Sequence, residues 1–133
     1  MTDPRYPVRS FPPALGAASE ARRFVAGAVG DLGHPEMAED AALITSELAT
    51  NAVRHADSEF VVVVTPDDGG VCISVWDSAP GAPGPRDAQL HDTSGRGLRL
   101  VSQMSERWGA EPLSGGKVVW ACLNPNQSWP EQS

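Results

Sequence analysis

Three polar side chains recur at steps of four residues in the segment ELATNAVRH, which spans residues 47–55. If this segment is helical, Glu47, Asn51 and His55 lie close together along one side of it, because an α-helix turns once in about 3.6 residues. Asn51 is unusual there, since its side chain competes with the helix for backbone hydrogen bonds. A Glu and an Asn at this spacing also occur by chance, and a histidine is favoured at a helix C-terminus by the helix dipole.

The helix that would carry these residues is predicted over residues 36–55, because its apolar positions form a single stripe. The stripe consists of Met37, Ala41, Ile44, Leu48 and Ala52. At about 100° per residue, Glu47, Asn51 and Arg54 fall on one flank of the stripe, and His55 falls closer to its centre. These four side chains are therefore expected at the edge of a crevice, where a helix can offer polar groups to a ligand lying between it and a loop.

Asp77 is a second candidate, because it ends the otherwise apolar run VCISVWDS, residues 71–78. A carboxylate in this place could accept a hydrogen bond from an exocyclic amino group such as that of adenine. The alternative is an ordinary turn-forming aspartate. Residues 79–94 then lack any sustained period, and long loops inside a compact domain are often functional.

A third candidate is the segment Gly95-Arg96-Gly97-Leu98, at the start of a helix predicted over residues 95–108. Glycines expose backbone N–H groups, and a helix N-terminus favours an anion such as phosphate. Arg96 and Arg99 could add charge-assisted hydrogen bonds. The alternative is a flexible loop joined to a capped helix, since a lone Gly-x-Gly is weak evidence.

The elements around these candidates predict an α+β fold. A helix is expected over residues 17–32, with Ser19 as its cap and Gly33 as its stop. The predicted strands cover residues 6–11, 60–66, 71–78, 108–111 and 117–123, with turns at DDGG and LSGG. Tight turns give antiparallel pairs, so we predict a two-layer α/β sandwich: a mostly antiparallel mixed sheet covered on one face by three helices.

Composition narrows the class of partner. The chain has 133 residues and a formal net charge of −7, which argues against a nucleic-acid or anionic-membrane surface. No stretch approaches the length of a membrane-spanning helix and the N-terminus lacks the apolar region of a signal peptide, so a cytoplasmic protein is expected. Cys72 and Cys122 lie in apolar runs and are expected to be buried free thiols, with a disulfide as the alternative. Trp76 and Trp120 are expected to pack in or on the sheet.

Taken together and in this order, the motifs resemble the GHKL ATP-binding (Bergerat) fold of gyrase, Hsp90 chaperones, histidine kinases and MutL. The resemblance rests on three motifs: the E-x-x-x-N helix of residues 47–51, the strand that ends at Asp77 and the Gly-x-Gly of residues 95–97. The phrase NAVRHA, residues 51–56, is similar to the single-domain anti-sigma-factor serine/threonine kinases. The resemblance covers residues 11–123, after an N-terminal edge segment of residues 1–10 and before a polar tail of residues 124–133.

The resemblance implies a role for each matching position. Asn51 would coordinate Mg²⁺ that bridges the ATP phosphates, and Glu47 would be the general base. Asp77 would recognise the adenine amino group, and Gly81 belongs to the glycine pattern that follows it. Gly95 and Gly97 would let the lid, residues 79–94, approach the phosphates. Arg54, His55, Arg96 and Leu98 would complete the nucleotide site.

The family also implies partners and an activity. An anti-sigma-factor kinase binds a sigma factor, phosphorylates an antagonist protein, and forms a homodimer. Three positions depart from the family pattern: Ala79 replaces the first glycine after Asp77, and Lys117 and Val118 stand where a threonine often helps to bind adenine. These departures favour an alternative function, a regulatory binding module with weak or no catalysis. A fragment of a histidine kinase is a third reading.

Overall fold

The computed structural model describes residues 6–55, 59–78 and 99–125. Five strands form one sheet: β1 (Val8–Phe11), β2 (Phe60–Asp67), β3 (Gly70–Asp77), β4 (Arg107–Leu113) and β5 (Gly116–Leu123). Their order in the sheet is β1-β2-β3-β5-β4, and each neighbouring pair is antiparallel. The two tight hairpins, β2–β3 and β4–β5, are those that the turn sequences predict. The predicted α+β sandwich is therefore confirmed.

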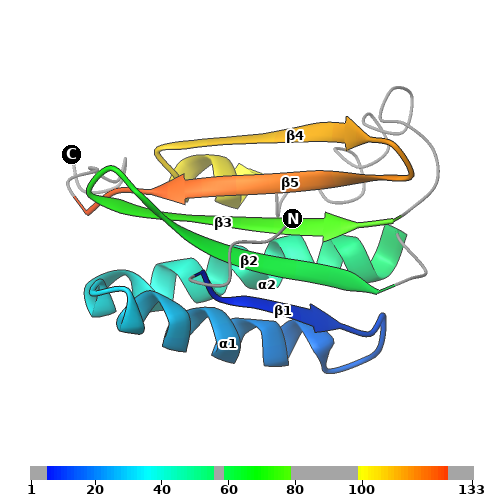
Figure 1. Cartoon of the computed structure of the whole chain (residues 1–133), viewed down its shortest axis with the longest axis horizontal. Coiled ribbons are helices and arrows are strands. Elements are labelled where there is room, and N and C mark those ends of the chain that lie inside the picture. Colours follow the sequence, from blue (N-terminus) through cyan, green and yellow to red (C-terminus); the bar gives the residue numbers. More distant parts are fainter. Residues whose placement is uncertain (1–5, 56–58, 79–98, 126–133) are drawn as a thin grey trace.

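The helices cover one face of this sheet (Figure 1). They are α1 (Ala17–Asp31), the short 3₁₀ helix η1 (Pro35–Met37) and α2 (Ala38–His55). Residues 99–104 are also helical, and Val101 and Met104 of that helix join the same buried core. The long loop predicted over residues 79–94 and the segment Gly95 to Leu98 lie outside the described residues.

The core forms where the apolar stripes of the helices meet alternate residues of the strands. In β2 and β3 the helix-facing residues are Phe60, Val62, Val64, Val71, Ile73 and Val75, and all six are buried. The predicted stripe is buried too, from Met37 of η1 to Ala52 of α2. Because successive strand residues point to opposite faces, the same alternation decides which polar residues face the helices.

One predicted helix cap and one predicted helix end were wrong, although α1 begins at Ala17 as predicted. Helix α1 begins after Gly16, whose φ of 90° suits glycine, so Ser19 is not the cap. The Ser19 hydroxyl instead accepts a hydrogen bond from Arg23, Nη1 to Oγ 3.3 Å. The last predicted helix stops before residue 105, because the Glu106 N–H donates to the carbonyl of Cys122 at 2.8 Å and so leads the chain into β4.

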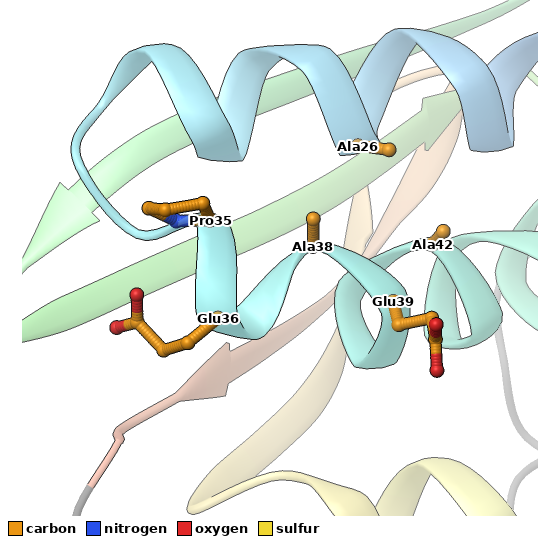
Figure 2. A pocket seen from close by; sticks show the side chains of 6 residues that line it. All are labelled: Ala26, Pro35, Glu36, Ala38, Glu39 and Ala42. Atoms are coloured by element: carbon orange, nitrogen blue, oxygen red, sulfur yellow. The ribbon is translucent and has the colours of Figure 1, made fainter.

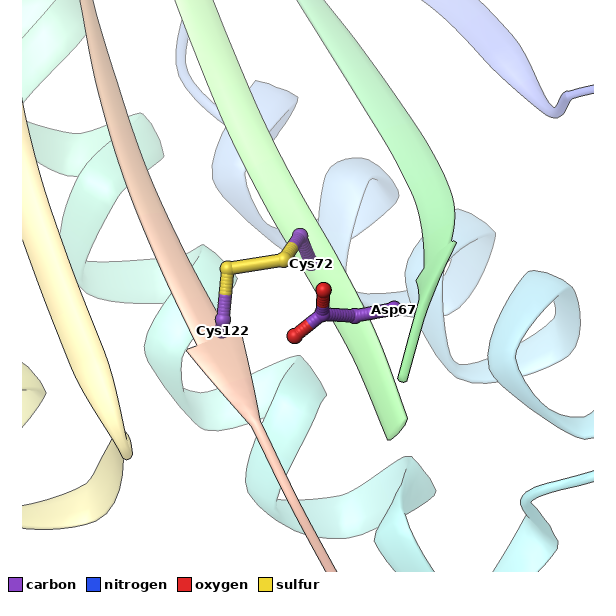
Figure 3. Close-up of side chains that lie close together, drawn as sticks. All are labelled: Asp67, Cys72 and Cys122. Atoms are coloured by element: carbon purple, nitrogen blue, oxygen red, sulfur yellow. A yellow bond between two sulfur atoms is a disulfide. The ribbon is translucent and has the colours of Figure 1, made fainter. Parts of the chain in front are cut away.

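The expectation of two free thiols was also wrong. Cys72 of β3 and Cys122 of β5 stand directly opposite each other, with their Cα atoms 4.0 Å apart, and form a disulfide (Figure 3). Strand register brings them together, and neither apolar run carries that information by itself.

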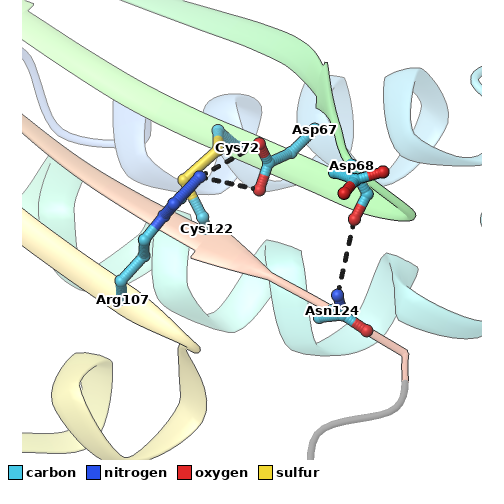
Figure 4. The surroundings of a disulfide bond; sticks show 6 residues. All are labelled: Asp67, Asp68, Cys72, Arg107, Cys122 and Asn124. Atoms are coloured by element: carbon cyan, nitrogen blue, oxygen red, sulfur yellow. Dashed lines mark hydrogen bonds and ion pairs between the residues drawn. A yellow bond between two sulfur atoms is a disulfide. The ribbon is translucent and has the colours of Figure 1, made fainter.

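An ion pair lies beside the disulfide on the helix-free face of the sheet (Figure 4). Arg107 Nη2 donates to both carboxylate oxygens of Asp67, at 3.0 Å and 2.9 Å. The Asp67 carboxylate and the two sulfur atoms are within 4.8 Å of one another, a spacing that a metal ion could use. Both sulfurs are committed to the covalent bond and the carboxylate to Arg107, so we assign no metal site here.

The two tryptophans lie on this same helix-free face. Trp120 packs over Gly109 of β4 so closely that a Cβ at residue 109 would come within 2.6 Å of the indole ring. Trp76 is 41% exposed, and its Nε1 donates to Ser74 Oγ at 2.8 Å. The expectation of packing on the sheet is confirmed for Trp120, whereas Trp76 lies on the sheet with much of its surface exposed.

Candidate functional site

Helix α2 holds Glu47 and Asn51 one turn apart on the flank of its buried stripe. Both residues are half-buried, whereas Arg54 is exposed. Among the residues that the structure describes, neither Glu47 nor Asn51 forms a side-chain hydrogen bond or an ion pair. A carboxylate and an amide that border the core without a protein partner are free to meet a ligand. His55 is the last residue of α2.

Asp77 ends β3 with its side chain on the helix-facing side, where only 2% of the side-chain surface is exposed. Its Oδ2 atom lies 3.0 Å from the Nζ atom of Lys117, whose side chain is 13% exposed. The two residues are register partners in β3 and β5. This ion pair was not predicted: the sequence indicated only that Lys117 lacks a hydroxyl. Once the register of β3 against β5 is known, the alternation of side chains along both strands places Asp77 and Lys117 side by side on the same face.

Gly116 allows β5 to begin close against the end of β3. A Cβ at this position would lie 2.0 Å from the carbonyl oxygen of Asp77 and 2.9 Å from Cα of Ser78, distances that no side chain can occupy. The absence of a side chain at Gly116 is therefore what brings Lys117 within reach of the Asp77 carboxylate.

The C-terminal end of α2, the end of β3 and the start of β5 lie at the same end of the sheet (Figure 1). Phe60, which opens β2, is the register partner of Asp77. Helix α2 ends at His55, shortly before Phe60, so its C-terminal half lies at the end of the sheet where β3 stops and β5 starts. Glu47, Asn51 and the Asp77–Lys117 pair are thus brought to the same end. Gly81, Gly95, Arg96, Gly97 and Leu98 lie outside the described residues.

The donor set at this end fits a magnesium nucleotide. Mg²⁺ binds oxygen ligands and often takes only one or two from the protein, with phosphates and water supplying the rest. The amide oxygen of Asn51 can be such a ligand, and the Glu47 carboxylate lies one turn away. A carboxylate as deeply buried as that of Asp77 can orient a base by accepting a hydrogen bond from it.

A separate hollow opens between α1 and the start of α2 (Figure 2). It measures about 400 Å³ and is lined by Ala26, Pro35, Glu36, Ala38, Glu39 and Ala42. It lies near the N-terminal end of α2, away from Asn51, and its two glutamates would repel a phosphate. It therefore forms no part of the candidate nucleotide site.

Comparison with known families identifies the class of domain. A family model described as a histidine kinase-like ATPase domain matches residues 11–123. The chain belongs to this family, and it is therefore an ATP-binding domain of the GHKL type. No curated protein matches the chain significantly. In the part of the chain that the structure describes, no helix is long and apolar enough to cross a membrane.

Proposed function

We propose that this chain is an ATP-dependent serine/threonine protein kinase of the anti-sigma-factor type. It would bind a sigma factor and phosphorylate an antagonist protein of that sigma factor. One observation carries the proposal: Glu47 and Asn51 border the core without side-chain partners among the described residues, at the end of the sheet where Asp77 is buried. Phosphoryl transfer depends chiefly on positioning and charge stabilisation, and these groups supply both.

Each residue has a defined task in this proposal. Asn51 would hold Mg²⁺ through its amide oxygen, and the ion would neutralise charge on the phosphates. Glu47 accepts the proton of the serine or threonine hydroxyl whose oxygen takes the γ-phosphoryl group, and ADP leaves. Asp77 orients the adenine.

The remaining residues are proposed to enclose the phosphates. Arg54 and His55 extend the site along the last turn of α2. Gly81, Gly95 and Gly97 allow the lid to approach the nucleotide, and Arg96 adds a charge-assisted hydrogen bond beside Leu98.

Transfer of the γ-phosphate from labelled ATP to a cognate antagonist protein tests the catalytic claim. Glu47→Gln should lower the rate at least about a hundredfold, because general-base catalysis contributes about that much. Glu39→Gln is a matched control, since it removes the same charge from an exposed position on the same helix. Equal rates for the wild type and Glu47→Gln would refute the kinase assignment.

The proposed partners are a sigma factor and its antagonist, and the proposed assembly is a homodimer in the cytoplasm. The partners and the homodimer come from the family resemblance, and the cytoplasm from the sequence analysis. Sedimentation of the purified chain, alone and with a sigma factor, measures the assembly directly. A monomer that binds no sigma factor would contradict this part of the proposal and leave the phosphotransfer test unaffected.

The Lys117–Asp77 ion pair favours a second candidate, a regulatory module that binds its partner without phosphorylating it. An adenine amino group would have to share the Asp77 carboxylate with Lys117. Calorimetry with Mg-ATP separates the two candidates. Binding that is abolished in Asp77→Asn counts against a module without nucleotide, and no binding by the wild type counts against the kinase.

A further inference from the structure

We infer that Lys117 is a second residue that recognises the base: its ammonium group donates a hydrogen bond to N1 of adenine, while Asp77 accepts one from the 6-amino group. This inference rests on the proposed ATP-binding function and adds a residue that determines how the base edge is bound.

The position of Lys117 supports this role. It is the only lysine in the chain, and only 13% of its side chain is exposed. Burying an ammonium group is costly unless a partner compensates, and the partner is Asp77 Oδ2 at 3.0 Å. An ammonium has three donors, and a single bond to Asp77 uses one of them. The other two can serve a ligand that enters beside the carboxylate.

The pair also complements adenine in chemistry and spacing. The Watson–Crick edge of adenine presents a donor, the 6-amino group, directly beside an acceptor, N1. Asp77 and Lys117 present an acceptor and a donor 3.0 Å apart on the helix-facing side of the sheet. A carboxylate alone contacts only the donor half of that edge. With Lys117 beside it, both halves of the edge find a partner.

Two simpler roles for Lys117 predict different behaviour. A lysine that only balances the charge of Asp77 would make no contact with the base, so the affinity would not depend on N1. A competitor for the carboxylate would weaken ATP binding, so its removal would raise the affinity. Only a base-contacting lysine makes affinity depend on N1 and on Lys117 together.

The experiment is a thermodynamic cycle in which both the nucleotide and residue 117 are varied. Calorimetry compares Mg-ATP with its 1-deaza analogue, in which N1 is a C–H group, for the wild type, Lys117→Met and Lys117→Arg. The wild type should prefer ATP by about ten- to a hundredfold, the value of a hydrogen bond from a charged donor. In Lys117→Met the preference should vanish, because methionine matches the length and has no donor. Lys117→Arg should keep part of it.

The unmodified chain provides a readout that requires no substitution. Because Lys117 is the only lysine, ¹⁵N-lysine labelling gives one side-chain ammonium resonance. ATP should shift this resonance more than the 1-deaza analogue does. Equal affinities and equal shifts for the two nucleotides would overturn the inference and leave ATP binding intact. Failure of the wild type to bind either nucleotide would instead overturn the proposed function, and the inference with it.

Discussion

At the scale of single residues, the candidate site depends on one close backbone approach. Gly116 lets β5 start against the end of β3, since a Cβ there would lie 2.0 Å from the Asp77 carbonyl oxygen. The polar contact between Lys117 and Asp77 is a consequence of that approach. Part of the proposed ligand chemistry thus depends on a residue that has no side chain.

Replacement of this glycine tests the point. Gly116→Ala should lower the free energy of unfolding by about 1–3 kcal/mol, the usual cost of forcing an extra group into a packed site. The measurement is urea denaturation. Gly27→Ala is the control, because Gly27 lies in α1 with open space around its Cβ position, and alanine should stabilise a helix there by about 0.5–1 kcal/mol. Equal effects of the two substitutions would contradict the close approach.

Asp40, in the first turns of α2, makes stability depend on pH. Burial raises the pKa of its carboxyl above the ordinary value of 3.8, and the negative charge of Glu39 raises it further. A raised pKa means that the folded state binds the proton more tightly than the unfolded state does. The stabilisation is therefore present below pH 3.8 and is lost as the pH rises through the folded-state pKa.

We accordingly expect Asp40→Asn to gain stability relative to the wild type as the pH rises from about 3 to 7. Urea denaturation of both proteins across this range measures the difference. Asp68→Asn, at an exposed turn position, is the comparison. A difference between wild type and Asp40→Asn that stays constant with pH would rule out the raised pKa.

At the scale of elements, α2 combines two functions on adjoining faces. Its stripe buries Ala41, Ile44 and Leu48 against the sheet, and its flank offers Glu47 and Asn51. The position of the polar pair relative to the sheet is determined by how the stripe packs. A change in the stripe should therefore affect stability first, and nucleotide binding through the orientation of the helix.

Leu48→Ala should lower the free energy of unfolding by about 2–5 kcal/mol, because Leu48 is 2% exposed and its removal leaves a cavity. Leu43→Ala on the same helix should have a much smaller effect, since Leu43 is 37% exposed. Chemical denaturation gives both values. Similar losses for the two leucines would mean that the helix is rotated about its axis from the orientation described.

The elements were largely predictable from the sequence, because each carries its own period. The α2 stripe and the alternation in β2 and β3 are local patterns. The Ser19 cap failed because a glycine in the left-handed region, Gly16, begins the helix three residues earlier. The predicted end of the last helix failed because pairing with β5 overrides the helical pattern at residues 107 and 108.

The site was predictable only in part, for a physical reason. Glu47 and Asn51 are neighbours on one helix, so their spacing alone places them together. The Asp77–Lys117 and Cys72–Cys122 pairs join strands that are distant in sequence. Neither pair can be inferred until the register of β3 against β5 is known, and no local pattern specifies that register.

At the scale of the whole molecule, the disulfide closes a large part of the chain into a loop. Its cysteines are 50 residues apart, and the loop includes the rest of β3, all of β4 and most of β5. A covalent link of this length restricts the unfolded chain much more than the folded one. Its main effect on stability is therefore expected to come from the unfolded state.

Reduction with dithiothreitol should lower the free energy of unfolding by about 2–4 kcal/mol. Denaturation with and without the reductant measures this, with thiol alkylation and mass spectrometry to verify the redox state. A Cys72→Ser, Cys122→Ser double variant should be destabilised to a similar degree and should be insensitive to the reductant. An unchanged unfolding transition after verified reduction would show that the disulfide does not contribute to the free energy of unfolding.

The register shared by the two pairs restricts how this chain can vary in length over evolution. Asp77 is as far from Cys72 along β3 as Lys117 is from Cys122 along β5. Deleting a single residue from either interval would turn Asp77 or Lys117 to the face without helices, because side chains alternate. Functional descendants can therefore lengthen or shorten these intervals only in both strands together and by an even number of residues. The length of the connection between β3 and β4 is not restricted in this way.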